Sequence, residues 1–298
     1  MDSKTMPAIA LVLALLALAL ALQATHGETV RVRATTTTSL YATGLLEHLA
    51  REFQSTHRDV TIQYIPVGSG EALKRAERGD ACLVLVHAPS LEKRYIDEGV
   101  IGYHRIFAYN YFVIVGPGSD PAGVKGSKSI VEVMHRIYNA GEAGRIVFVS
   151  RGDRSGTHVR ELQLWREAGL DPTGKPWYIE TGQGMGETLV IAGNKEAYTL
   201  SDIGTYLKFK AEGRIPGLEI LYSGDPSLIN IYSAYLVTGC SGRERDAAKA
   251  FIDFLVSSRG QRLIASYGVE EYGQPLFHPV AGRLSQIEAV WRGMAEGG

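Results

Sequence analysis

Three polar turns in this chain are rich in hydroxyl groups; two of them also contain glycine, and one contains arginine. The most complex is SRGDRSGTH at 150–158, which follows the apolar run 146–149 and precedes a helical pattern over 157–168. The others are ATTTTS at 34–39 and VGSGEA at 67–72, which also lead from a strand-like segment into a helix-like one. A helix N-terminus offers free N–H groups and partial positive charge, so added hydroxyls and a guanidinium make an anion site without a metal cation.

Each turn also has a simpler interpretation. Ser69, Ser155 and Thr157 are residue types that often cap helices, and Arg151 could pair with Asp153 at the surface. Ser155 with His158 and Asp153 could suggest a serine nucleophile. The chain has no G-x-S-x-G elbow there, and three neighbours on one turn rarely form a relay.

The elements that must position these turns alternate between strand and helix patterns along almost the whole chain. This alternation predicts an α/β fold with mostly parallel sheets. Two long strands rich in tyrosine and β-branched residues, at 109–115 and 230–237, bracket the central third. We expect them to cross between two lobes. The predicted lobes are 28–112 plus 236–298, and 113–235.

The N-terminal stretch has the pattern of a secretory signal. Residues 8–22 are only Ala, Leu, Ile and Val, with Lys4 before them and small residues after them. We predict a signal peptide within 1–27 that exports the chain, with an uncleaved N-terminal anchor as the alternative.

Composition narrows the remaining choices. The 298 residues carry a net charge of -1, so no overall field favours nucleic acid or acidic membranes. In an exported protein the only two cysteines, Cys82 and Cys240, could form a disulfide. Their places in apolar strands favour the alternative of two unpaired, buried small residues. Two cysteines with no nearby histidine cluster give no zinc pattern.

The motifs together resemble the tungstate-binding proteins of ABC importers over about residues 30–279. They are TTTS (36–39), TGLL (43–46), VGSGEAL (67–73), VLVHAPS (84–90), YNYFVIVGPGSDPAG (109–123), SRGDRSGTH (150–158), WYIETGQGMGETL (177–189) and AYTLSDIGTYL (197–207). The resemblance implies the two-lobe type II periplasmic-binding fold of α/β class, with two crossover strands and an oxoanion held in an interlobe cleft.

Phosphate-binding proteins have similar turns, and 151–157 fits their R-x-D-x-S-G-T pattern. One position departs from that family. Where it commonly has an aspartate that accepts the proton of hydrogen phosphate, this chain has His87, before Ala88-Pro89. Tungstate and molybdate carry no such proton at neutral pH, so a site rich in donors suits them better. His87 could donate to the anion or simply pack at a strand end, and both readings stay open.

The resemblance implies an extracytoplasmic solute-binding component, expected as a monomer, that delivers tungstate, or molybdate, to an ABC permease and its ATPase. It implies no enzyme activity, no organic cofactor and no bound metal cation. A phosphate-binding transport protein is the alternative, and a secreted serine hydrolase is a distant one. The predicted anion contacts are Thr38, Ser39, Ser69, Arg151, Ser155 and Thr157. Residues expected to support them are Thr37, Gly70, His87, Asp153 and Gly156, with Asp153 orienting Arg151.

Overall fold

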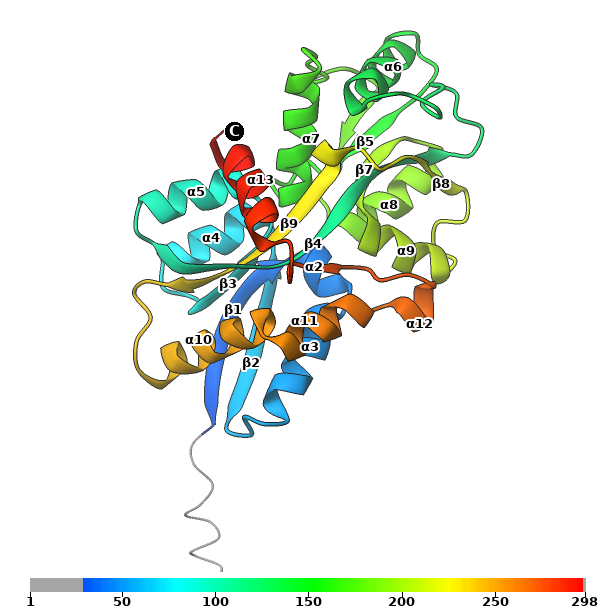
Figure 1. The fold of residues 1–298 in the computed structure, drawn as a ribbon. Coiled ribbons are helices and arrows are strands. Elements are labelled where there is room, and N and C mark those ends of the chain that lie inside the picture. Colours follow the sequence, from blue (N-terminus) through cyan, green and yellow to red (C-terminus); the bar gives the residue numbers. More distant parts are fainter. Residues whose placement is uncertain (1–28, 297–298) are drawn as a thin grey trace, which may run out of the picture.

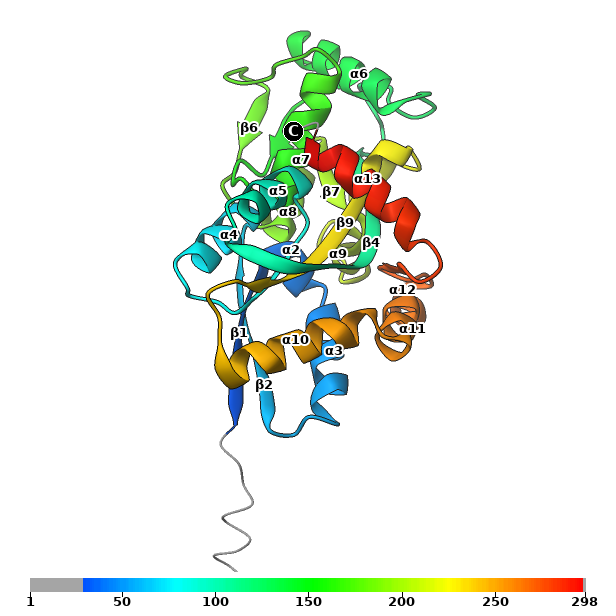
Figure 2. The same cartoon turned by 60° about the vertical axis from the view of Figure 1, so that its left-hand side comes forward.

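The computed structural model describes residues 29–296, and the predicted signal peptide at 1–27 lies outside them. These residues form two α/β lobes that share two long strands, β4 and β9 (Figures 1 and 2). In this part of the chain, the structure contains no helix with the length and apolar character needed to span a bilayer.

The sheet of the first lobe has the strand order β10-β4-β9-β3-β1-β2. Strand β1 runs parallel to β2 and β3, whereas the β3–β9, β9–β4 and β4–β10 pairs are antiparallel. The prediction of mostly parallel sheets is therefore wrong, because the crossover strands run against the direction of their neighbours. The strands are β1 (Val30–Thr37), β2 (Val60–Val67), β3 (Leu83–Val86), β4 (Ile101–Pro117), β9 (Ile229–Val237) and β10 (His278–Pro279).

Strand β4 passes from one lobe to the other. Its Ile101–Tyr111 stretch pairs with β9, and from Phe112 onward it pairs with β7 and then with β8. A parallel β5–β6 pair joins this second sheet through a bridge between Phe148 and Tyr198. Both predicted crossover strands are thus present, inside longer strands. The second-lobe strands are β5 (Phe148–Ser150), β6 (Tyr178–Glu180), β7 (Thr199–Asp202) and β8 (Leu218–Tyr222).

Helices cover both faces of each sheet. Those of the first lobe are α2 (Thr38–Ala42), α3 (Leu45–Gln54), α4 (Ser69–Glu77), α5 (Pro89–Asp97), α10 (Gly242–Val256), α11 (Ser258–Ser266), α12 (Val269–Tyr272) and α13 (Leu284–Glu296). The second lobe contains α6 (Ile130–Glu142), α7 (Gly156–Glu167), α8 (Met185–Asn194), α9 (Ile203–Ala211) and the short 3-10 helix Pro226–Leu228. The sequence pattern does not predict α2, because its threonine-rich approach favours a strand.

Strand β3 shows why the first-lobe sheet is buried on both faces. Leu83 and Leu85 pack into the cluster under α3, α10 and α11, whereas Val84 and Val86 pack into the cluster under α4 and α5. Successive side chains of a strand point to opposite faces, so a strand with helices on both sides reads as a continuous apolar run. The sheet therefore holds the end of β3, and His87 after it, in a rigid frame.

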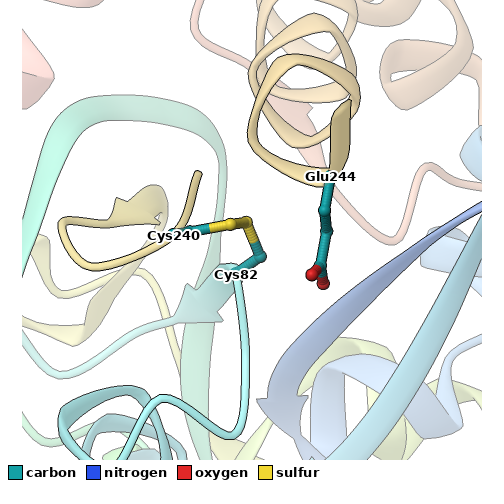
Figure 3. A group of neighbouring side chains, drawn as sticks. All are labelled: Cys82, Cys240 and Glu244. Atoms are coloured by element: carbon teal, nitrogen blue, oxygen red, sulfur yellow. A yellow bond between two sulfur atoms is a disulfide. The ribbon is translucent and has the colours of Figure 1, made fainter. Parts of the chain in front are cut away.

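The two cysteines form a disulfide between the residue before β3 and the turn after β9 (Figure 3). The favoured prediction of two unpaired cysteines is therefore wrong. The register of β3 and β9 brings them together, since Val237 donates its N–H to the carbonyl of Cys82. Glu244 lies near the disulfide in Figure 3, and its carboxylate forms an ion pair with Arg33, with 3.0 Å between Oε2 and Nη2.

Candidate functional site

The first-lobe turns place hydroxyls where strands give way to helices. Thr37, the last residue of β1, caps α2 by accepting a hydrogen bond from the N–H of Leu40 at 3.2 Å. This leaves Thr38 and Ser39 in the first turn of α2. In the polar turn at 67–72, Gly68 is extended and Ser69 begins α4, with the Oγ of Ser69 fully buried. Both turns therefore lie at the same edge of the sheet, where β1 and β2 end side by side.

The second-lobe turn is shaped by its own side chains. Asp153 Oδ1 accepts from the N–H of Ser155 at 3.1 Å, and Ser155 Oγ accepts from the N–H of His158 at 3.3 Å. Gly152 has φ of 63°, and a Cβ there would lie 2.6 Å from the Cβ of Glu180. A side chain at this position would therefore be both strained and obstructed. Ser155 caps α7 through its acceptor lone pairs, so its hydroxyl proton stays free to donate.

Arg151 is the buried charge of the site, with only 1% of its side chain exposed. Its Nη2 donates to Asp153 Oδ2 at 2.5 Å and to Thr38 Oγ1 of the first lobe at 3.2 Å, and its Nε reaches Gln183 O at 3.4 Å. Its Nη1 is buried without a hydrogen-bond partner. Asp153 thus orients the guanidinium, and one nitrogen of the fork stays uncommitted.

The turns of the two lobes meet directly. An added Cβ at Gly68 or Gly70 would lie 3.5 Å from the carbonyl oxygen of Asp153 or Arg154, respectively. At Gly156 it would lie 2.6 Å from the carbonyl oxygen of His87, closer than real Cβ contacts come. Glycine at 156 therefore allows the start of α7 to reach the end of β3. All three predicted turns are brought together.

Three of the predicted anion contacts on these meeting turns have a polar atom that is buried without a hydrogen-bond partner: Ser69 Oγ, Arg151 Nη1 and Thr157 Oγ1. A buried donor without a partner carries a free-energy cost, so a cluster of them indicates a ligand that supplies acceptors. Two further such atoms, Thr36 Oγ1 and His158 Nε2, lie on the same turns, and those on Ser127 and Arg160 lie outside them. The meeting turns thus hold five of the seven such atoms found among the described residues, and those five come from both lobes.

His87 lies at the end of β3, 3% exposed, with its Nδ1 2.8 Å from Asn230 Oδ1. The amide of Asn230 donates to Asn110 Oδ1 and to the Tyr232 hydroxyl, so its Oδ1 accepts and Nδ1 of His87 carries the proton. Burial, the largest effect, and the positive charge of Arg151 together lower the pKa of His87 to about 4. The neutral ring therefore turns an acceptor, Nε2, toward Ser39 Oγ at 3.5 Å.

This arrangement bears on both roles considered for His87. A neutral ring with its proton on Nδ1 has none on Nε2 to donate to an anion. The ring is also packed near Tyr232 and Phe112, with centroid separations of 5.0 and 6.3 Å. Ser39 can donate its hydroxyl proton either to His87 or to a ligand, but not to both.

The trio Ser155, His158 and Asp153 does not form a nucleophile relay. Nδ1 of His158 accepts from the N–H of Arg154 at 3.0 Å, and its Nε2 lies 3.7 Å from Glu180 Oε1. The ring is thus hydrogen-bonded to the backbone of Arg154 while Nε2 has no hydrogen-bond partner, and Ser155 Oγ contacts only the backbone of His158. His158 is buried, with 6% of its surface exposed, whereas Arg154 is exposed.

Four residues with contacts at or near the site are not predicted from the sequence. Asn110 and Asn230 face each other in the β4–β9 register, and Gln183 contacts Arg151 through its backbone oxygen. Lys208 reaches the first lobe from α9. The asparagines carry a signal that could have found them: each is a polar residue inside an aromatic, otherwise apolar strand. A backbone contact and a lysine on a helix surface leave no comparable signal.

Two α/β lobes with two shared strands and a donor-rich site between their turns define a solute-binding protein of the periplasmic-binding type. The model of the PBP superfamily domain matches residues 23–259. The tungstate-binding protein TupA of Peptoclostridium acidaminophilum is 36% identical over 271 residues, covering 88% of this chain and 92% of that protein. The chain belongs to the PBP superfamily and, within it, to the family of the TupA proteins.

Solved structures agree with this assignment. The tungstate-binding protein TupA from Desulfovibrio alaskensis is 39% identical, with a TM-score of 0.70, over 84% of this chain and 99% of that one. The tungstate ABC transporter protein from Geobacter sulfurreducens is 40% identical, with a TM-score of 0.71, over 80% of this chain and 98% of that one. The predicted two-lobe periplasmic-binding fold and family are confirmed.

Proposed function

We propose that this chain binds tungstate between its lobes as the solute-binding component of an ABC importer, with molybdate as the nearest competitor. The observation that carries the proposal is the set of buried, unpartnered polar atoms that both lobes contribute: Ser69 Oγ, Arg151 Nη1 and Thr157 Oγ1. A tetrahedral oxoanion offers acceptors in several directions, so it can satisfy donors that converge from two sides. The names of the TupA relatives support the choice of tungstate.

We expect Thr38, Ser39 and Ser155 to complete the contacts. Thr38 already touches Arg151, and Ser155 keeps a free hydroxyl proton at the N-terminus of α7. Backbone N–H groups of this first turn add partial positive charge toward the ligand. Thr37, Gly70 and Gly156 act by shaping the turns rather than by touching the anion.

The donor and acceptor balance favours a fully ionised dianion over hydrogen phosphate. Hydrogen phosphate carries a proton that needs an acceptor. Asp153, the carboxylate paired with Arg151, has both oxygens engaged, by Arg151 and by the N–H of Ser155, and the acceptor Nε2 of His87 faces Ser39 Oγ. The charge of Asp153 is therefore committed within its own turn. Phosphate binding remains the alternative, and the experiment below decides it.

Competitive calorimetry with tungstate, molybdate and phosphate tests this function. We expect tungstate binding with a Kd in the micromolar range or below, and phosphate at least a hundredfold weaker. The hundredfold preference corresponds to about 2.8 kcal/mol, roughly one buried donor left without an acceptor. Absence of binding heat with all three anions, at several temperatures, would refute the proposal. Tighter binding of phosphate would replace it with the phosphate alternative.

The transport role leads to further proposals. The segment 1–27 exports the chain to an extracytoplasmic location, the bound oxoanion passes to a permease with its ATPase, and the protein works as a monomer without catalytic activity. The lobe boundaries at 112/113 and 235/236 serve as the hinge. Cell fractionation of the full chain, with and without 1–27, tests export, because loss of that segment is expected to retain the protein in the cytoplasm.

A further inference from the structure

Lys208 makes a second contact between a cationic side chain of the second lobe and helix α2 of the first. Its Nζ lies 2.6 Å from the carbonyl oxygen of Ala42, the last residue of α2. At the other end of the same helix, Arg151 Nη2 donates to Thr38 Oγ1. The short helix that carries the predicted contacts Thr38 and Ser39 is therefore contacted at both ends by side chains of the opposite lobe.

The surroundings make this a contact between lobes rather than a flexible surface lysine. Tyr206 and Phe209 bury α9 in the second-lobe core, which fixes the helix that presents Lys208. Leu207 packs against apolar clusters of both lobes. On the first-lobe side, the Tyr267 hydroxyl donates to Thr43 O at 2.8 Å and holds the segment just after α2. Both partners are thus anchored in separate lobes.

The position of the contact separates it from the oxoanion. Ala42 ends α2, whereas the predicted ligand side chains begin it, and Lys208 donates to a backbone carbonyl rather than into the meeting turns. A contact that exists only when the lobes are together stabilises that arrangement whether or not an anion is present. When a binding-competent state is partly populated, the apparent Kd is the intrinsic Kd divided by its fraction.

We propose that Lys208 is a positioning residue: a latch that stabilises the closed arrangement of the lobes and sets oxoanion affinity without touching the oxoanion. This inference rests on the proposed function for the identity of the ligand, but not for the latch itself. The latch acts on the closed fraction, so it changes the affinity for every oxoanion by the same factor. It leaves the preference among oxoanions unchanged.

The chain offers a matched control two residues away. Lys210 lies on the same helix and also donates to backbone carbonyls, those of Pro216 at 2.8 Å and Leu218 at 2.7 Å. Both acceptors belong to its own lobe. Replacing Lys210 therefore removes the same kind of hydrogen bond without touching the contact between lobes.

The test compares Lys208→Met, Lys208→Arg and Lys210→Met with the unmodified protein. Calorimetry gives the Kd for tungstate and for molybdate, and small-angle X-ray scattering gives the radius of gyration without ligand. For Lys208→Met we expect both Kd values to rise by a common factor of about ten, equivalent to 1.4 kcal/mol. We also expect a larger radius of gyration without ligand. Lys208→Arg should recover most of the affinity, and Lys210→Met should bind as the unmodified protein does.

Three results would overturn the latch: unchanged affinity in Lys208→Met, a loss confined to one oxoanion, or an equal loss in Lys210→Met. The second would mean that Lys208 contacts the ligand, and the third that the loss reflects damage within the second lobe. If the unmodified protein binds neither oxoanion, the proposed function fails, and scattering alone then decides. A larger radius in Lys208→Met but not in Lys210→Met still supports the latch, and equal radii refute it.

Discussion

Replacement of Arg151 is the sharpest test of the site, because this side chain joins the ligand, the turn and the opposite lobe. In Arg151→Ala the unpartnered Nη1 is lost, and so is the contact of Nη2 with Thr38. Asp153, with 17% of its side chain exposed, then keeps a negative charge without its cation, next to the place expected for a dianion. The substitution therefore removes attraction and adds repulsion at the same time.

The size of the effect follows from these two parts. A hydrogen bond to a charged group contributes about 1.5–3 kcal/mol, and breaking a buried ion pair costs about 3–5 kcal/mol. Asp153 retains some contact with water, which reduces the cost of leaving it unpaired, so we expect a total loss of about 3–4 kcal/mol, below the simple sum of the two contributions. That loss corresponds to a tungstate Kd roughly 10²- to 10³-fold higher.

Calorimetry with three further variants separates the contributions. Arg151→Lys keeps the positive charge, but its single nitrogen must serve Asp153, Thr38 and the anion, so we expect an intermediate loss of affinity. The double variant Arg151→Gln with Asp153→Asn removes both charges and should bind better than Arg151→Ala, because the repulsion is gone. Arg154→Gln removes an exposed charge from the same turn and should bind within about twofold, as is usual for surface substitutions. A folded Arg151→Ala protein whose tungstate Kd is within threefold of the unmodified value would refute the assigned role of Arg151.

Three other outcomes follow from the same contacts. Gly156→Ala should weaken tungstate binding roughly tenfold or more, because its Cβ would meet the carbonyl oxygen of His87; overpacking costs about 1–3 kcal/mol. Calorimetry checks this, and unchanged affinity would mean that the lobes close differently. Reduction of the disulfide, or Cys82→Ser with Cys240→Ser, should lower Tm by on the order of 10 °C with little effect on Kd, since a closed loop of this length contributes up to about 5 kcal/mol. Equal melting curves would exclude a stabilising role. The free energy of unfolding should decrease as the pH falls from 6.5 to 4. Over this interval the unfolded chain protonates His87, whereas the folded protein keeps it neutral because its pKa is lowered to about 4. In His87→Gln, the Tm from melting curves should depend less on pH over that interval. An unchanged dependence of Tm on pH would contradict the neutral ring.

The turns could be predicted from the sequence because their physical signals are local. Serine, threonine and glycine between an apolar strand and an amphipathic helix indicate a helix N-terminus, and Arg151 adds charge to one of them. The tyrosine-rich crossover strands were equally visible. Helix α2 was not, because Thr35–Thr38 favours a strand until the cap at Thr37 redirects the chain.

What the sequence could not reveal depends on register and on the meeting of distant segments. Cys82 and Cys240 are 158 residues apart, and only the pairing of β3 with β9 places them in contact. Asn230 fixes the tautomer of His87 across 143 residues, and that contact decides whether the ring turns a donor or an acceptor toward Ser39. A residue type alone carries neither piece of information.

The charges of the site explain why closure and binding belong together. Arg151 and Asp153 cancel each other formally, and the guanidinium spends Nη2 within the protein, so little net charge is left to attract a dianion. Affinity must therefore come from neutral donors and the one remaining nitrogen, and these are divided between Ser69 in one lobe and Arg151 and Thr157 in the other. Neither lobe alone offers the full set, so separating them removes about half of the contacts in a single step. Interlobe contacts that never touch the anion, such as Lys208 with Ala42, consequently change affinity as directly as the donors do, and pulling the lobes apart suffices to release the anion.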